Sequence, residues 1–256
     1  MSNMRVAAQL YTLREFLRTP DEIARSLHKV AEIGYRAVQL SAMGPIEPAR
    51  LKEIADREGL TICSTHVDYD ELLNETQRMI AEHKLWGCRH VAIGSMPARY
   101  RQAGEQGFRQ FAREASELGR RLHEAGLTFS YHNHSFEFER FGNKLGLEII
   151  FEESDPRYLL AEIDTYWVQH GGGDPVQWIR RYAGRMVIVH FKDMSVRNGQ
   201  QTMAEVGEGN LNWPAIVAAC REAGIEWCAV EQDICHRDPF ESLAISLRNL
   251  KGLGLE

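Results

Sequence analysis

The sequence predicts an α/β protein of the (β/α)8 TIM barrel class, folded as a single domain over residues 1–256. Short β-rich runs alternate with amphipathic stretches along the whole chain, at a period of about 30 residues and without a linker. Polar side chains end nearly every β-rich run, as expected where function gathers at the carboxyl ends of all barrel strands. An open doubly wound sheet would instead gather function at one switch point, and no Gly-rich nucleotide loop follows the first run.

The predicted strands and helices alternate strictly. The strands are expected at residues 5–12, 35–41, 60–67, 88–95, 127–134, 158–167, 185–193 and 226–233. The helices are expected at residues 20–33, 48–58, 70–86, 105–125, 144–153, 175–182, 212–223 and 239–250. Pro20 and Pro175 each follow a capping residue, Thr19 and Asp174, which indicates a helix start. Helix, glycine and strand follow one another repeatedly, for example at Gly34, where glycine supplies a left-handed cap.

The composition argues against several classes of partner. A formal net charge of −6 gives no general attraction for nucleic acid or for an anionic membrane surface. No run approaches the roughly 18 apolar residues of a membrane span, and MSNMRVAAQL lacks the pattern of a signal peptide. The five cysteines are scattered without a CxxC pair, so they are expected to be reduced and packed in the core. We expect a cytoplasmic protein.

The last four predicted strands carry polar side chains on one face, because residues two apart on a strand point the same way. These faces carry Ser130, His132 and His134; Glu162 and Asp164; Ile188, His190 and Lys192; and Ala229, Glu231 and Asp233. Buried carboxylates that converge without compensation repel one another, and a divalent cation would relieve this. Imidazole and carboxylate ligands suit Mn²⁺, Mg²⁺, Co²⁺ or Zn²⁺. The alternative is a set of ion pairs and hydrogen bonds that only fills the barrel.

Five motifs resemble those of the xylose-isomerase-like TIM barrels, the sugar phosphate isomerase/epimerase family. They are YHNHSFEF (131–138), AEIDTYWVQHGGGDP (161–175), VIVHFKDM (187–194), VGEGNLNW (206–213) and VEQD (230–233). The family also includes inosose dehydratase, dehydroshikimate dehydratase, ketose 3-epimerases and endonuclease IV. The resemblance covers essentially the whole chain. It implies one divalent metal ion, a small-molecule sugar substrate and a homo-oligomer, either a dimer or a tetramer.

The resemblance also implies a ligand set. Many members hold their metal with a Glu, an Asp, a His and a Glu that end the last four strands, which places Asp164, His190 and Glu231 on three of these positions. His132 stands where the first Glu would be, as a fourth ligand or as a base. The ketose epimerases use two glutamates on opposite faces of the substrate, and this chain has only Glu231 of that pair.

A metal that coordinates the adjacent carbonyl and hydroxyl oxygens of a keto-sugar or keto-polyol makes the neighbouring C–H more acidic. It also stabilises the enediolate that forms when the proton is removed. Reprotonation then gives an epimer or an isomer, whereas loss of a β-oxygen substituent makes the enzyme a lyase or dehydratase. Glu231 is expected as ligand and base, and Lys192 as the group that polarises the carbonyl or protonates a leaving oxygen.

Five further residues are predicted to contact substrate: His66, His134, Glu208, Trp167 and Arg237. Glu208 lies in a Gly-Glu-Gly loop and is otherwise a plain turn residue, and aromatic packing is the alternative for Trp167.

Three other functions are alternatives for a barrel of this kind. An abasic-site nuclease needs ligands for about three metals and a basic surface, which this acidic chain lacks. A metal-dependent hydrolase and a non-catalytic sugar-binding barrel are the remaining alternatives.

Overall fold

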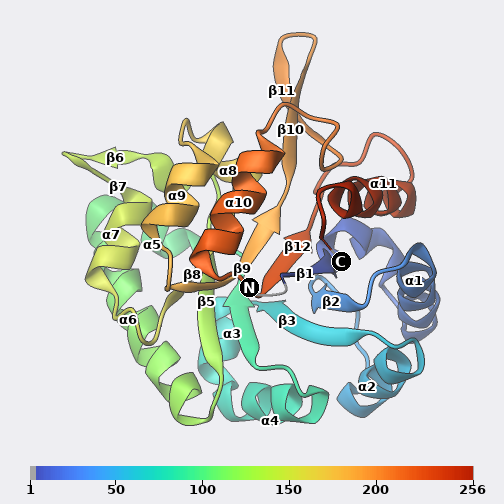
Figure 1. Ribbon diagram of the computed structural model, residues 1–256. Helices are drawn as coiled ribbons and strands as arrows, with labels where there is room; N and C mark the ends of the chain where they lie inside the picture. Colours follow the sequence, from blue (N-terminus) through green and yellow to red (C-terminus); the bar gives the residue numbers. More distant parts are fainter. Residues whose placement is uncertain (1–3, 256) are drawn as a thin grey trace.

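The structure, a computed structural model, describes residues 4–255 as one closed barrel of parallel strands (Figure 1). Its strands are β1 (Arg5–Gln9), β2 (Ala37–Leu40), β3 (Thr61–Val67), β4 (His90–Ile93), β5 (Thr128–His132), β8 (Leu160–Asp164), β9 (Met186–Phe191) and β12 (Trp227–Val230). They close in the order β1-β12-β9-β8-β5-β4-β3-β2, so neighbours in sequence are neighbours in space. The prediction of a single-domain (β/α)8 barrel is confirmed.

A helix follows each barrel strand and covers the outside of the barrel. The long helices are α1 (Pro20–Ile33), α2 (Pro48–Arg57), α4 (Thr76–Trp86), α6 (Gly104–Glu124), α7 (Gly146–Glu153), α9 (Pro175–Arg181), α10 (Trp213–Ala223) and α11 (Pro239–Gly252). The predicted starts at Pro20 and Pro175 are confirmed. Thr19 accepts from the Glu22 N–H in a capping box, and Asp174 accepts from the Val176 N–H.

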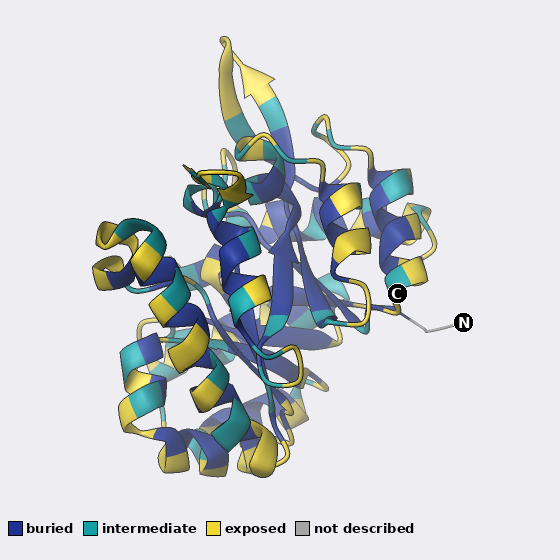
Figure 2. Cartoon of the chain, turned by 90° about the vertical axis from the view of Figure 1, so that its left-hand side faces the viewer, coloured by how far each residue is buried: buried dark blue, intermediate teal, exposed yellow. Residues whose placement is uncertain are grey.

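The apolar core lies mainly between the barrel and the helices, where the buried strands are enclosed by helices with exposed outer faces (Figure 2). A second, smaller apolar cluster fills the barrel interior with Ala7, Ala37, Cys63, Ile188, Trp227 and Ala229. Further along the same strands, the inward positions carry polar side chains such as Gln9, Gln39 and His190. The interior is therefore apolar low in the barrel and polar toward the carboxyl ends of the strands.

Three predicted elements end earlier or divide differently in the structure. The strand predicted at 5–12 ends at Gln9 and gives way to a 3-10 helix, η1 (Leu10–Phe16). The strand predicted at 158–167 ends at Asp164, because its carboxylate accepts from the Trp167 N–H and caps α8 (Thr165–His170). The helix predicted at 70–86 is two helices, α3 (Tyr69–Asn74) and α4.

Several short elements interrupt the regular alternation without being predicted. They are α5 (Ala98–Gln102), the 3-10 helix η2 (Phe136–Phe138), the hairpin of β6 (Arg140–Phe141) and β7 (Lys144–Leu145), and the hairpin of β10 (Asp193–Arg197) and β11 (Gln200–Ala204). The β10–β11 hairpin continues from β9 and projects from the barrel at the top of Figure 1. Within residues 4–255, no helix has the length and apolar character needed to cross a membrane.

Candidate active site

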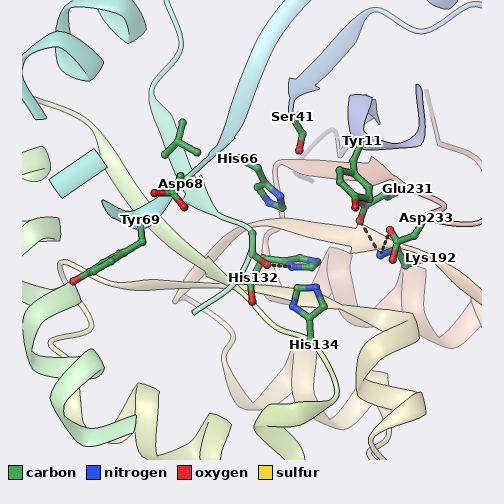
Figure 3. A pocket seen from close by; sticks show the side chains of 13 residues that line it. Tyr11, Ser41, His66, Asp68, Tyr69, His132, His134, Lys192, Glu231 and Asp233 are labelled. Atoms are coloured by element: carbon green, nitrogen blue, oxygen red, sulfur yellow. Dashed lines mark hydrogen bonds and ion pairs between the residues drawn. The ribbon is translucent and has the colours of Figure 1, made fainter. Parts of the chain in front are cut away.

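A cavity of about 360 Å³ opens at the carboxyl ends of the barrel strands (Figure 3). Its lining comes from the ends of seven barrel strands and the segments after them: Tyr11, Ser41, His66, Val67, Asp68, Tyr69, Gly94, Ser95, His132, His134, Lys192, Glu231 and Asp233. This is the end of the barrel at which the sequence predicts the site, and it is where barrel enzymes place their catalytic groups.

The four predicted metal ligands lie together. His132, Asp164, His190 and Glu231 each offer a ligand atom, and these atoms lie within 4.8 Å of one another. All four side chains are buried. Nε2 of His132 is 3.1 Å from Oδ2 of Asp164, and Nδ1 of His190 is 3.0 Å from Oε2 of Glu231. The alternation of side chains along four adjacent strands is sufficient to produce this convergence.

Lys192 is fully buried beside these ligands. Its Nζ lies 3.2 Å from Oδ2 of Asp164, 2.9 Å from Oε2 of Glu231 and 2.9 Å from Oδ1 of Asp233. Burial disfavours the ammonium, but the three carboxylates outweigh it and raise the pKa of Lys192 above its usual range. Lys192 is therefore a cation held at the cavity wall. Asp233 is an anchor of this lysine to which the sequence analysis gave no role.

A further carboxylate, that of Glu162, lies deeper in the barrel than the four candidate ligands. Oε1 of Glu162 is 2.6 Å from Nε2 of His66 and 2.7 Å from Nε2 of His190, and the Gln39 amide donates to it at 2.9 Å. His190 thus has a carboxylate at each ring nitrogen. Burial lowers the basicity of this imidazole, yet Glu162 and Glu231 raise its pKa to about 10. The sequence placed Glu162 on the inward face but did not reveal its partners.

The charge balance and the donors fit a divalent metal ion. Four carboxylates, those of Glu162, Asp164, Glu231 and Asp233, face two cations, Lys192 and protonated His190. Excess buried negative charge is costly unless a cation compensates it, and metal binding displaces protons from its ligands. Two imidazole nitrogens and two carboxylates form a mixed set that first-row divalent metals accept.

The orientation of His132 matches a ligand role. Its Nδ1 is 3.0 Å from the carbonyl oxygen of Gly94, to which a protonated Nδ1 donates. In the tautomer with Nδ1–H, Nε2 carries a lone pair 3.1 Å from Oδ2 of Asp164, and this lone pair can ligate a metal ion beside that carboxylate. A histidine in place of glutamate at the end of β5 therefore presents one ligand atom to the cluster.

Three of the five predicted substrate contacts lie at or beside the cavity. His66 and His134 line it, and the Trp167 ring lies 5.2 Å from that of His134 and 5.5 Å from Nζ of Lys192. Burial lowers the pKa of His134 to about 3, so this histidine is neutral at neutral pH. Within residues 4–255, Nδ1 of His134 and Nε1 of Trp167 are buried without a hydrogen-bond partner. Of these two residues, His134 lines the cavity, where its Nδ1 can bond to a substrate.

Glu208 and Arg237 take a different position. Nη2 of Arg237 lies 3.4 Å from Oε2 of Glu208, and its Nε lies 3.2 Å from Oε1 of Glu205. Neither residue lines the cavity. They pair with each other outside it, between the loop before α10 and the loop before α11. Tyr11, by contrast, lines the cavity. The sequence places it among the polar residues at the end of the first strand without a role in the site, and in the structure it belongs to η1.

Comparison with known proteins identifies relatives of this fold. The family model described as xylose isomerase-like TIM barrel matches residues 27–251. An inosose dehydratase of Geobacillus kaustophilus is 26% identical over 69% of this chain, a match that spans 62% of that protein, less than two thirds of its length. An inosose dehydratase of Lacticaseibacillus casei is 24% identical over 85% of both chains.

Solved structures agree in fold. A sugar phosphate isomerase/epimerase from Parabacteroides distasonis superposes with a TM-score of 0.81 at 22% identity, covering 98% of this chain and 94% of that one. An L-ribulose 3-epimerase superposes with a TM-score of 0.71 at 19% identity, with the same coverage. The family model covers most of the chain and the barrel closes as in these structures, so the chain belongs to the xylose isomerase-like TIM barrel family.

Proposed function

We propose that this protein is a divalent-metal-dependent enzyme that removes the proton next to the carbonyl of a keto-sugar or keto-polyol. The observation that carries the proposal is the convergence of His132, Asp164, His190 and Glu231 beside Lys192 at the carboxyl end of the barrel. Relatives named inosose dehydratase support a polyhydroxylated ketone as substrate. Mn²⁺, Co²⁺, Zn²⁺ and Mg²⁺ are the metals that suit these donors.

When bound, the metal supplies the Lewis acid that polarises the substrate carbonyl. Glu231 lines the cavity and accepts the proton: burial opposes its ionisation, but Lys192 and His190 hold its pKa well below the usual range. Lys192 donates a hydrogen bond to the oxygen on which negative charge develops. His132 serves as a ligand through Nε2, and His66, His134 and Trp167 orient the hydroxyl groups.

The fate of the enediolate sets the reaction class. Protonation of the same carbon from the opposite face gives an epimer, and protonation of the adjacent carbon gives an isomer. We propose isomerisation or epimerisation as the first candidate. A dehydratase or lyase is the second, in which the electron pair forms a C=C bond and the β-oxygen leaves with a proton from Lys192. His132 favours this second candidate, since elimination needs one base and the chain lacks the second glutamate.

The test is the metal content of the purified protein, measured by inductively coupled plasma mass spectrometry. About one Mn, Co, Zn or Mg per chain is expected in the wild type and none in the triple variant Asp164→Ala, His190→Ala, Glu231→Ala. The matched control replaces the same residue types on the exposed surface of α1: Asp21→Ala, His28→Ala, Glu32→Ala. A wild-type protein that carries no metal and takes up none on titration refutes the proposal.

Deuterium uptake then separates the reaction classes. In D₂O, a keto-sugar that gains deuterium at carbon and keeps its oxygens indicates isomerisation or epimerisation. Loss of a hydroxyl, with the ultraviolet absorbance of an enone, indicates elimination. A cytoplasmic location, a homo-oligomeric state and the absence of a nucleic-acid partner remain predictions from the sequence.

A further inference from the structure

A second cavity, of about 550 Å³, adjoins the active-site cavity. The two cavities share four lining residues, Ser41, His66, Val67 and Asp68, which end β2 and β3. The second cavity extends from this shared wall toward α2 and α4. A molecule held by the metal ligands can therefore continue past His66 and Asp68 without leaving the protein surface.

Apolar side chains form much of the lining of the second cavity, beside polar residues that include Ser41, Asp68 and Glu71. Its walls include Met43, Pro45, Ile46, Leu51, Met79 and Trp86. The polar atom of the Trp86 ring is already satisfied, because Nε1 donates to the Pro48 carbonyl at 3.0 Å. The guanidinium of Arg78 pairs with Glu71 at 2.7 Å and with Glu82 at 2.8 Å, so these charges satisfy one another. The apolar side chains offer no hydrogen-bond partner to the hydroxyl groups of a second sugar, whereas an apolar group can pack against them.

The loop that forms the wall next to β2 has a defined conformation. Ala42 has a left-handed backbone with φ 49°, which a non-glycine residue adopts only where the surroundings hold it. Gly44 donates to the Leu17 carbonyl at 2.7 Å, and a Cβ at Gly44 would lie 2.1 Å from the carbonyl oxygen of Arg18. The loop is therefore packed against the segment after η1, and the cavity wall is preformed.

We propose that this cavity binds an apolar substituent, about the size of an aryl group, that is attached to the sugar in the active site. The inference rests on the proposed function and narrows its substrate class to keto-glycosides with an apolar aglycone. Continuity through Ser41, His66, Val67 and Asp68 supplies the connection, and the apolar walls supply the chemistry. Burial of apolar surface drives the binding of such a group.

The test compares matched probes on the metal-loaded enzyme. The probes are the 2-keto and 3-keto forms of methyl and phenyl β-glucoside, with free keto-hexose alongside. Calorimetry gives the Kd, and deuterium exchange in D₂O gives the rate at the carbon next to the carbonyl. The phenyl glycoside is expected to bind at least about tenfold more tightly than the methyl glycoside, since even one well-packed methylene discriminates by that factor.

A double variant locates the effect. Met43→Gln with Ile46→Asn makes two partly buried cavity residues polar and is expected to reduce the phenyl preference to below about threefold, with the methyl glycoside unchanged. Val196→Asn, at an exposed apolar residue of the β10–β11 hairpin, is the control and keeps the full preference.

The outcomes separate this inference from the proposed function. Exchange on the methyl glycoside without a phenyl preference overturns the subsite and leaves the proposed function intact. Exchange on none of the probes overturns the proposed function, and the subsite with it. A double variant that keeps the phenyl preference overturns the subsite. If this variant also has a lower molar mass than the wild type in light scattering, the groove is an interface between copies of this chain.

Discussion

Asp193 is predicted to contribute more to stability than any exposed acid of this chain. It is fully buried at the start of β10, and its carboxylate accepts hydrogen bonds from five N–H groups. These belong to the backbones of Met194 (2.7 Å), Gly207 (2.9 Å), Gly209 (3.0 Å) and Leu211 (3.2 Å) and to the Trp213 indole (2.5 Å). The loop over residues 205–212 therefore folds around a single side chain.

The substitution Asp193→Ala leaves these donors without their acceptor. A buried group without a partner costs about 1–3 kcal/mol, and water reaches some of the donors once the loop relaxes, so we expect a loss of about 4 kcal/mol. For a chain of this length, each kcal/mol lowers Tm by roughly 2–4 °C. The variant should melt about 10 °C below the wild type.

Differential scanning calorimetry measures this difference, with Asp174→Ala as the matched control. Asp174 also accepts backbone N–H groups, but it is an exposed N-cap of α9 that bonds to the Val176 N–H. Its loss should cost about 1 kcal/mol, or roughly 3 °C. If the two variants melt within 3 °C of each other, the buried carboxylate does not organise the loop and the reasoning is wrong.

Two further predictions concern single residues. Burial raises the pKa of Glu137 to about 7, so between about pH 4.5 and 7 the folded state binds a proton that the unfolded state has lost. The free energy of unfolding should fall by about 3 kcal/mol as the pH rises through this window, and it should depend less on pH in the variant Glu137→Gln. Urea unfolding of both proteins at pH 5 and pH 8 measures this difference, and an equal pH dependence in the two proteins would contradict the prediction. Lys192→Met should bind metal at least as tightly as the wild type, because a competing cation is removed, while proton exchange falls about 100-fold. A metal titration beside the exchange assay checks this, and parallel loss of both would contradict it.

The barrel was predictable because its evidence is repeated along the chain. Eight alternations of strand and helix each carry local signals, and an error in one does not alter the class. The errors occur where aromatic residues follow a strand. Leu10–Phe16 and Thr165–His170 contain residues that favour strands, but local hydrogen bonds turn both segments into helices: Gln9 accepts from the Tyr11 N–H, and Asp164 accepts from the Trp167 N–H.

The β10–β11 hairpin did have a signal in the sequence. Its turn is Asn198-Gly199, and both residues have positive φ, 52° and 76°. Asn-Gly is the typical pair for a tight hairpin turn, since both positions need a left-handed backbone. Strict alternation of strands and helices predicts only a loop between the seventh strand and the helix after it. The Asn198-Gly199 turn was therefore not predicted to form a hairpin.

The convergence of the four proposed metal ligands was predictable, but the residues that support them were not. Alternation on adjacent strands places His132, Asp164, His190 and Glu231 without knowledge of any contact. Gln39 and Glu162 meet across the barrel interior, from β2 and β8, which are not neighbours in the sheet. Sequence pattern carries no information on that distance. Sequence pattern likewise did not reveal the pairing of Glu208 with Arg237 at 3.4 Å, and their contact with substrate stays a prediction.

The motif HFKDM shows how one strand end can serve two purposes. Lys192 and Asp193 are consecutive, so their side chains leave the chain on opposite sides. Lys192 enters the cavity and contacts Asp164, Glu231 and Asp233, whereas Asp193 turns away and holds the loop over residues 205–212. HFKDM and the later GEG loop are thus physically linked in this chain, since Asp193 accepts from the N–H groups of Gly207 and Gly209. Substitution at Lys192 should therefore impair catalysis, and it should also lower stability unless a bound metal ion compensates the three carboxylates. Substitution at Asp193 should chiefly destabilise the loop over residues 205–212.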